Sequence, residues 1–90
     1  MKRCHIIVHG TVQGVFYRTY TKNAAAILNI KGWVRNLPNG SVEIVAEGKE
    51  QDIKQFIIKL RKGSPASAVE EIDTEWSETK KEFSDFEIVR

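Results

Sequence analysis

A short loop bounded by Gly10 and Gly14 is followed four residues later by Arg18. Gly14 would let an anion approach the backbone closely, and the Arg18 guanidinium is a permanently charged fork that can hold two phosphoryl oxygens. If this loop leads from a strand into a helix, the unpaired N–H groups at the helix start add partial positive charge. The segment therefore predicts a site for a tetrahedral dianion, although a glycine turn before a solvated arginine would have the same composition.

Asn36 is the second residue whose type and position suggest chemistry. It stands near the end of a predicted strand, two residues before Pro38. Its uncharged amide can donate to and accept from the same water molecule, so it could orient that water. An asparagine that only starts a turn would fit the same position.

The first half of the chain contains the elements that must position these two residues. Residues 4–9 have the period-two pattern of a strand. From about residue 18 to 28 the pattern is helical, and the expected apolar face contains Tyr20, Ala24, Ile27 and Leu28. Residues 33–37 predict a second strand, and Asn39-Gly40 predicts a tight hairpin turn.

The second half continues the alternation of strands and helices. Residues 41–47 predict a strand, and residues 49–61 predict an amphipathic helix with Gly63 placed to cap it. Residues 69–76 predict an acidic, partly exposed edge strand, and residues 83–89 a last, shorter strand. The βαββαβ order predicts an α+β, ferredoxin-like sandwich: an antiparallel sheet with two helices on one face.

Length and composition restrict the class of protein. Ninety residues predict one domain, residues 1–90, and 41% hydrophobic with 29% charged residues is typical of a globular chain. A net charge of +2 is too small to indicate nucleic-acid binding by itself. The lone Cys4 suits a reducing compartment, and no stretch approaches the roughly 20 apolar residues of a membrane span. We therefore expect a cytoplasmic protein without nucleic-acid or membrane partners.

Two segments resemble the signatures of the acylphosphatase family. Residues 10–18 resemble the first signature: a glycine, one variable residue, Val-Gln-Gly-Val, one variable residue, an aromatic residue or Met, and Arg. Residues 32–48 resemble the second signature, with matches at Gly32, Trp33, Asn36, Gly40, Val42 and Gly48. Tyr17 stands where Phe is usual, and we expect its added hydroxyl to have little effect on the loop. The likeness covers essentially the whole chain.

This resemblance implies a hydrolase that splits the carboxyl–phosphate bond of acyl phosphates into carboxylate and inorganic phosphate. It makes Arg18 the phosphate-binding arginine and Asn36 the residue that positions the attacking water. The implied phosphate cradle is the backbone of Gln13, Gly14, Val15, Phe16 and Tyr17. No metal or cofactor is implied, the expected partner is a small-molecule acyl phosphate, and we expect a monomer.

The chemistry of an acyl phosphate explains why so few residues could suffice. The leaving carboxylate is the conjugate base of an acid with a pKa of about 4, so it needs no general acid at neutral pH. Phosphoryl transfer has a loose transition state, and catalysis is mainly positioning and charge stabilisation. An amide such as that of Asn36 is too weak a base to deprotonate water. The proton would pass to the substrate's own phosphate oxygen or be lost late.

The two histidines predict no further site. His5 and His9 share a strand face but lie about 13 Å apart at ~3.3 Å per residue, whereas zinc holds its ligands within roughly 2.3 Å. Cys4 is expected in the core. Nothing in the sequence places a hydroxyl beside either histidine, so no Ser-His-Asp set is predicted.

Three other functions share parts of this pattern. An RNA-recognition module has the same βαββαβ order, but it needs aromatic and basic residues on its third strand, where this chain has Glu43 and Glu47. Small-ligand regulatory domains usually accompany a catalytic domain. Acylphosphatase-like domains also occur inside larger carbamoyl-transfer maturation proteins, where such a domain could bind acyl or carbamoyl phosphate without catalysis. The 90-residue length leads us to expect the free enzyme.

Overall fold

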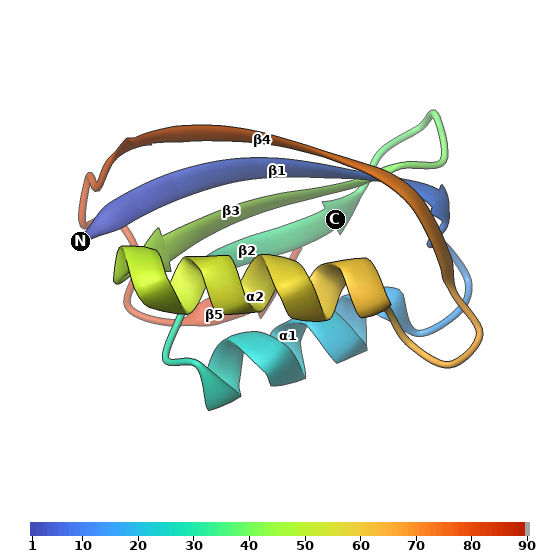
Figure 1. Cartoon of the computed structure of the whole chain (residues 1–90), viewed down its shortest axis with the longest axis horizontal. Helices are drawn as coiled ribbons and strands as arrows, with labels where there is room; N and C mark the ends of the chain where they lie inside the picture. The colour runs from blue at the N-terminus through green and yellow to red at the C-terminus, as the bar shows by residue number, and fades with distance from the viewer. Residues whose placement is uncertain (90) are drawn as a thin grey trace.

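The computed structural model describes residues 1–89, which form two helices and a five-stranded sheet. The elements in chain order are β1 (Lys2–Thr11), α1 (Tyr17–Ile27), β2 (Lys31–Asn36), β3 (Val42–Gly48), α2 (Glu50–Lys62), β4 (Ala68–Glu78) and β5 (Phe86–Ile88). Both helices cover one face of the sheet (Figure 1), which confirms the predicted α+β, ferredoxin-like fold. Within the described residues, no helix has the length and apolar character needed to cross a membrane.

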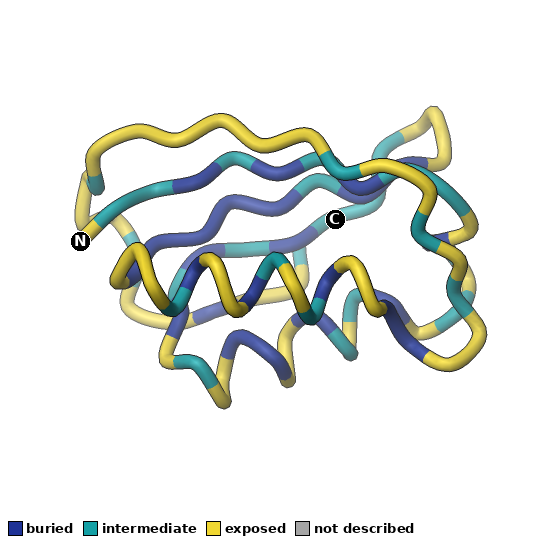
Figure 2. Tube along the Cα trace, viewed as in Figure 1, coloured by how far each residue is buried: buried dark blue, intermediate teal, exposed yellow. Residues whose placement is uncertain are grey.

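The hydrophobic core lies between this face of the sheet and the two helices. Figure 2 shows buried residues along β1, β3 and β2 and on the inner side of the helices, whereas β4 is largely exposed. The predicted inward faces of the strands are confirmed, because Cys4, Ile6, Val8, Val42, Ile44 and Ala46 are all fully buried. The apolar residues predicted from strand alternation and those predicted from the helical period of α2 therefore pack into the same core.

The predicted apolar face of α1 was wrong at one position. Ile27 is 73% exposed, and the residues that α1 buries are Tyr17, Thr21, Ala24 and Ala25. The helix begins at Tyr17, and at 100° per residue Ile27 then falls outside the stripe that contains Tyr17, Thr21 and Ala24. Thr21 can face inward because its hydroxyl donates to the Tyr17 carbonyl at 2.8 Å, which satisfies the buried polar group.

The last two strands lie at opposite edges of the sheet, whose order is β4-β1-β3-β2-β5. β4 is the acidic edge strand that the sequence predicts, and its charges disfavour pairing with another chain. β5 departs from the predicted antiparallel sheet because it pairs in parallel with β2. It is also shorter than the predicted 83–89, since the chain between β4 and β5 must first cross from one edge to the other.

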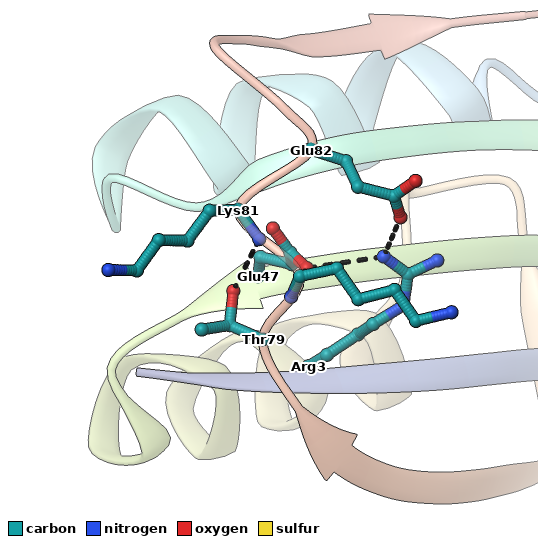
Figure 3. Close-up of polar contacts among 6 residues, drawn as sticks. Arg3, Glu47, Thr79, Lys81 and Glu82 are labelled. Carbon is teal, nitrogen blue, oxygen red and sulfur yellow. Dashed lines mark hydrogen bonds and ion pairs between the residues drawn. The ribbon is translucent and has the colours of Figure 1, made fainter.

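A buried carboxylate holds this crossing segment against the sheet (Figure 3). Glu47 of β3 is 3% exposed, and it accepts hydrogen bonds from Arg3 at 3.2 Å and from the Lys80 backbone N–H at 2.9 Å. Arg3 also pairs with Glu82 of the crossing segment. Burial alone would raise the pKa of Glu47, but the bonds from Lys80 and Arg3 outweigh it and hold that pKa below its usual value.

Glu47→Gln is expected to lower the free energy of unfolding at pH 7 by about 2 kcal/mol, because it removes one partner of a buried ion pair. The folded pKa of Glu47 is depressed, so its contribution is present above the unfolded pKa and is lost as the pH falls below about 4.5. Urea unfolding of both proteins between pH 3 and 7 measures this, and the difference should shrink in acid. Glu78→Gln, which removes an exposed pair with Lys2, is the control. A difference that does not depend on pH would contradict the role of the ionised carboxylate.

Candidate active site

β1 turns toward α1 at a bulge. The pairing of β1 with β4 shifts register between His9 and Gly10, and Gly10 has a φ of 129°. A Cβ at this position would lie 2.2 Å from the Ala68 carbonyl oxygen, so only glycine fits. Bulges of this kind redirect the chain at the end of a strand. Here the bulge leads into the loop that the sequence predicts as an anion site.

The φ angles of the loop backbone alternate in sign just before α1. Gly14 has a φ of 73° and Phe16 a φ of 61°, whereas Gln13 and Val15 do not have positive φ. Consecutive residues of alternating hand turn their N–H groups toward one concave side, which is suited to an anion. Phe16 is the N-cap of α1, makes no side-chain capping bond, and is followed by a first turn without acidic residues. The first N–H groups of the helix are therefore not capped by a side chain.

Three hydrogen bonds from two side chains brace this loop. The Gln13 amide donates to the carbonyl oxygens of Leu37 and Ser41, both at 2.8 Å, and so ties the loop to the turn between β2 and β3. The Ser64 hydroxyl, from the segment after α2, donates to the Val15 carbonyl at 3.0 Å. Both partners of the loop are distant in sequence, so these contacts fix its position relative to the rest of the fold.

The Tyr17 hydroxyl anchors the start of α1. Tyr17 is fully buried, and its hydroxyl donates to the Leu60 carbonyl near the end of α2 at 2.8 Å. Burial raises the pKa of Tyr17, so the hydroxyl remains protonated and able to donate. The hydroxyl therefore makes a specific helix–helix contact that a phenylalanine at this position would lack.

A cavity of about 250 Å³ opens at the start of α1. Five of the seven predicted site residues line it: Gly14, Phe16, Tyr17, Arg18 and Asn36. Val12, Thr19 and Ile88 also line it and were not predicted. Thr19 could have been found, because it lies in the same first helical turn, but no sequence signal brings β5 to this end of β2. Gln13 and Val15 do not line the cavity and instead carry the bonds that brace the loop.

Asn36 enters the cavity from the last position of β2. Because strand side chains alternate, Arg35 points to the open face of the sheet, where it bonds Glu43 at 2.7 Å, and Asn36 points to the helix side. Its side-chain oxygen is buried and accepts no hydrogen bond from the described residues. An unpaired buried acceptor costs about 1–3 kcal/mol and often marks a functional position. It is suited to the O–H of a water or ligand.

The prediction that no hydroxyl lies beside a histidine was wrong. The Ser41 hydroxyl lies 3.0 Å from His9 Nδ1, and His9 Nε2 lies 2.9 Å from an Asp73 carboxylate oxygen. The sequence could not show this because the three residues come from different segments that meet only in the sheet. Ser41 is only 4% exposed, however, and neither Ser41 nor His9 lines the cavity at the start of α1. The three residues tie β1 to β4 and to the start of β3.

Cys4 and His5 belong to the sheet, as expected. Burial raises the pKa of the Cys4 thiol to about 11, so it is neutral near pH 7. His5 lies on the open face, with its Nε2 2.7 Å from Glu43. In residues 1–89, the His, Cys, Asp and Glu side chains form no group of three or more that could hold a metal ion.

The fold and the cavity together define a small α+β domain with an uncapped helix start, an arginine and an unpaired amide oxygen around one opening. A family model described as Acylphosphatase matches residues 4–88. An acylphosphatase of Syntrophus aciditrophicus is 45% identical and is aligned over 99% of this chain and 93% of its own length. The chain belongs to the acylphosphatase family, and it is an enzyme.

Solved structures agree with this assignment. The crystal structure of an acylphosphatase from Bacillus subtilis matches with a TM-score of 0.97 and 38% identity over the full length of both chains. HypF from T. kodakarensis also matches, with a TM-score of 0.86 and 34% identity, but this chain covers only 12% of HypF. The likeness is therefore greater to a small acylphosphatase than to the corresponding part of HypF.

Proposed function

We propose that the chain hydrolyses the carboxyl–phosphate bond of acyl phosphates to carboxylate and inorganic phosphate, with the cavity at the start of α1 as its active site. The observation that carries this site is that Arg18, Asn36 and the uncapped first turn of α1 line a single cavity. Membership of the acylphosphatase family supports the reaction.

In this proposal, the phosphoryl group lies at the start of α1. Arg18 binds two of its oxygens, and the backbone N–H groups of residues 13–17 form the phosphate-binding loop around the others. The partial positive charge of the helix start adds to the stabilisation of the dianion. Only the backbone of Gln13 takes part, because its side chain is bonded to the β2–β3 turn.

Asn36 holds the attacking water on the side of phosphorus opposite the acyl oxygen. The water oxygen forms a bond to phosphorus while the bond between phosphorus and the acyl oxygen breaks, and its electron pair leaves with the carboxylate. The proton of the water passes to a phosphate oxygen. A leaving group whose acid has a pKa of about 4 needs no general acid. This fits the lining of the cavity, in which no residue has a carboxyl or imidazole side chain.

We further propose that residues 1–90 act as one domain and as a monomer in the cytoplasm. The family match spans residues 4–88, which supports a single domain. The free and buried thiol of Cys4 fits a reducing compartment.

Phosphate release from benzoyl phosphate at neutral pH, in the presence of EDTA, tests this function. We expect turnover that survives the chelator, since Arg18 and the loop N–H groups supply the charge stabilisation. A well-folded protein without turnover would overturn the catalytic proposal and favour a domain that binds acyl or carbamoyl phosphate without hydrolysing it.

Gln13→Ala is expected to lower kcat about tenfold and to change KM less than twofold. The Gln13 amide bonds the carbonyls of Leu37 and Ser41, so its loss frees the turn that follows Asn36 to move relative to the loop. A shift of about 1 Å can slow a reaction by up to ~100-fold. Steady-state kinetics on benzoyl phosphate measures the effect, and urea unfolding measures the accompanying loss of stability, about 1–3 kcal/mol.

Ser64→Ala is the matched control, because it removes the other brace of the loop without touching the turn after Asn36. A second comparison uses the Asn36→Ala background, in which Gln13→Ala should have little further effect on kcat. If Gln13→Ala lowered kcat equally in both backgrounds, Gln13 would not act through Asn36.

A further inference from the structure

We propose that Phe16 and Ile88 form an apolar acyl subsite at the mouth of the cavity, which favours acyl phosphates with bulky apolar acyl groups. The proposal rests on the proposed function, because it assigns the part of the substrate that lies outside the phosphate cradle. Both residues line the same cavity as Arg18 and Asn36.

Phe16 occupies a position that folding alone does not explain. Its backbone has a φ of 61°, a conformation that is unfavourable for a residue with a Cβ, and its side chain is 84% exposed. A glycine would relieve the strain, as at Gly14 two residues earlier. An exposed ring contributes little to the core. The position of Phe16 at the cavity is therefore the feature that can account for a phenylalanine here.

Ile88 reaches the cavity from β5, the edge strand next to β2. It pairs with Val34 across the parallel β2–β5 contact. Phe86, two residues earlier on the same face of β5, is buried against the Phe56 ring, whereas Ile88 is 39% exposed and lines the cavity. Two exposed apolar residues from distant segments thus line the cavity that also contains Arg18 and Asn36.

The size of the cavity indicates which substrates would reach these side chains. A volume of about 250 Å³ corresponds to about eight water-sized atoms, since liquid water occupies about 30 Å³ per molecule. The phosphorus and its four oxygens take about five of these, which leaves room for the remaining atoms of an acetyl group. The ring of a benzoyl group would extend beyond this space to the mouth, where Phe16 and Ile88 lie. An aromatic acyl group could therefore cover much more of the Phe16 ring than an acetyl group could.

The test compares kcat/KM for benzoyl phosphate and acetyl phosphate in the wild type, Phe16→Ala and Ile88→Ala. We expect the benzoyl-to-acetyl ratio to fall about fivefold in Phe16→Ala, the effect of losing one aromatic contact worth about 1 kcal/mol, and about two- to threefold in Ile88→Ala. Alanine at position 16 keeps a Cβ, so the backbone strain is unchanged. Ile27→Ala, which removes an exposed isoleucine at the far end of α1, should leave the ratio unchanged.

The outcomes separate this proposal from the function on which it rests. An unchanged ratio in both Phe16→Ala and Ile88→Ala, with turnover retained, would overturn the acyl subsite and leave the proposed function intact. A wild type that turns over neither substrate would overturn the proposed function itself. A lower ratio in only the Phe16 and Ile88 variants supports the subsite.

Discussion

Arg18→Gln is expected to lower kcat/KM for benzoyl phosphate by about 10³-fold or more. An arginine that stabilises charge on a transferred phosphoryl group contributes about 10³–10⁵ in rate, and glutamine keeps neither the charge nor the fork. None of the ion pairs found within residues 1–89 involves Arg18, so its loss breaks no such internal contact. Kinetics should therefore change while the urea unfolding midpoint stays close to that of the wild type.

Lys22→Gln is the matched control for Arg18→Gln. Lys22 is exposed one turn further along α1, so its replacement removes the same charge from the same helix without reaching the cavity. We expect less than a threefold change in kcat/KM. Arg18→Lys restores the charge without the planar fork and should lie about 10- to 100-fold below the wild type. If Lys22→Gln lowered kcat/KM as much as Arg18→Gln, the effect would come from general attraction of the anionic substrate by positive charge, and Arg18 would have no specific role.

Asn36→Ala is expected to lower kcat by about 10²–10³ with little change in KM, the effect of removing one preorganised hydrogen-bonding group from an active site. KM should hardly change, because Asn36 orients the water and Arg18 binds the phosphoryl group. The same substitution should leave the free energy of unfolding unchanged or raise it by about 1 kcal/mol, since it removes a buried oxygen without a donor. Steady-state kinetics and urea unfolding measure the two effects.

Asn39→Ala provides the control for Asn36→Ala. Asn39 is an exposed residue in the turn between β2 and β3, three residues after Asn36. Its side-chain oxygen accepts a hydrogen bond from the Ser41 backbone N–H at 3.0 Å. Its replacement tests the turn without touching the cavity, so kcat should stay within about threefold of the wild type. A rise in KM with normal kcat in Asn36→Ala would instead assign Asn36 to substrate binding.

The central part of the fold follows from local patterns in the sequence. The period-two alternation in β1 and β3 correctly predicts which side chains face the core, because each strand has one face on it. It does not predict that Val45 and Glu47, on the other face of β3, are buried as well. The apolar face of α1 was less predictable, since a buried Thr21 interrupts the apolar stripe and its compensating bond to Tyr17 is visible only in the structure. The parallel pairing of β5 has no local signal, because it depends on the path of the crossing segment.

The candidate site could also be predicted only in part from the sequence. The loop, Arg18 and Asn36 could be predicted because residues 10–18 and 32–48 resemble two family signatures, whereas glycine positions and residue types alone would also fit ordinary turns. The structure brings these residues to one cavity. The side chains that complete or support this site come from elsewhere in the chain. Ile88, Ser64 and the turn that Gln13 bonds are placed by tertiary contacts, so no spacing within the sequence could have assigned them.

The strand order has a consequence for the growing chain on the ribosome. β1 is made first but lies between β3 and β4, and β4 begins only at Ala68, while β5 ends at Ile88. At about 5–20 residues per second, the chain spends several seconds with β1, β2 and β3 available but both outer strands unmade. A nascent chain therefore holds Arg18 and Asn36 long before the sheet can close. Synthesis of β4 and β5, rather than synthesis of Arg18 and Asn36, sets the earliest moment at which activity can appear.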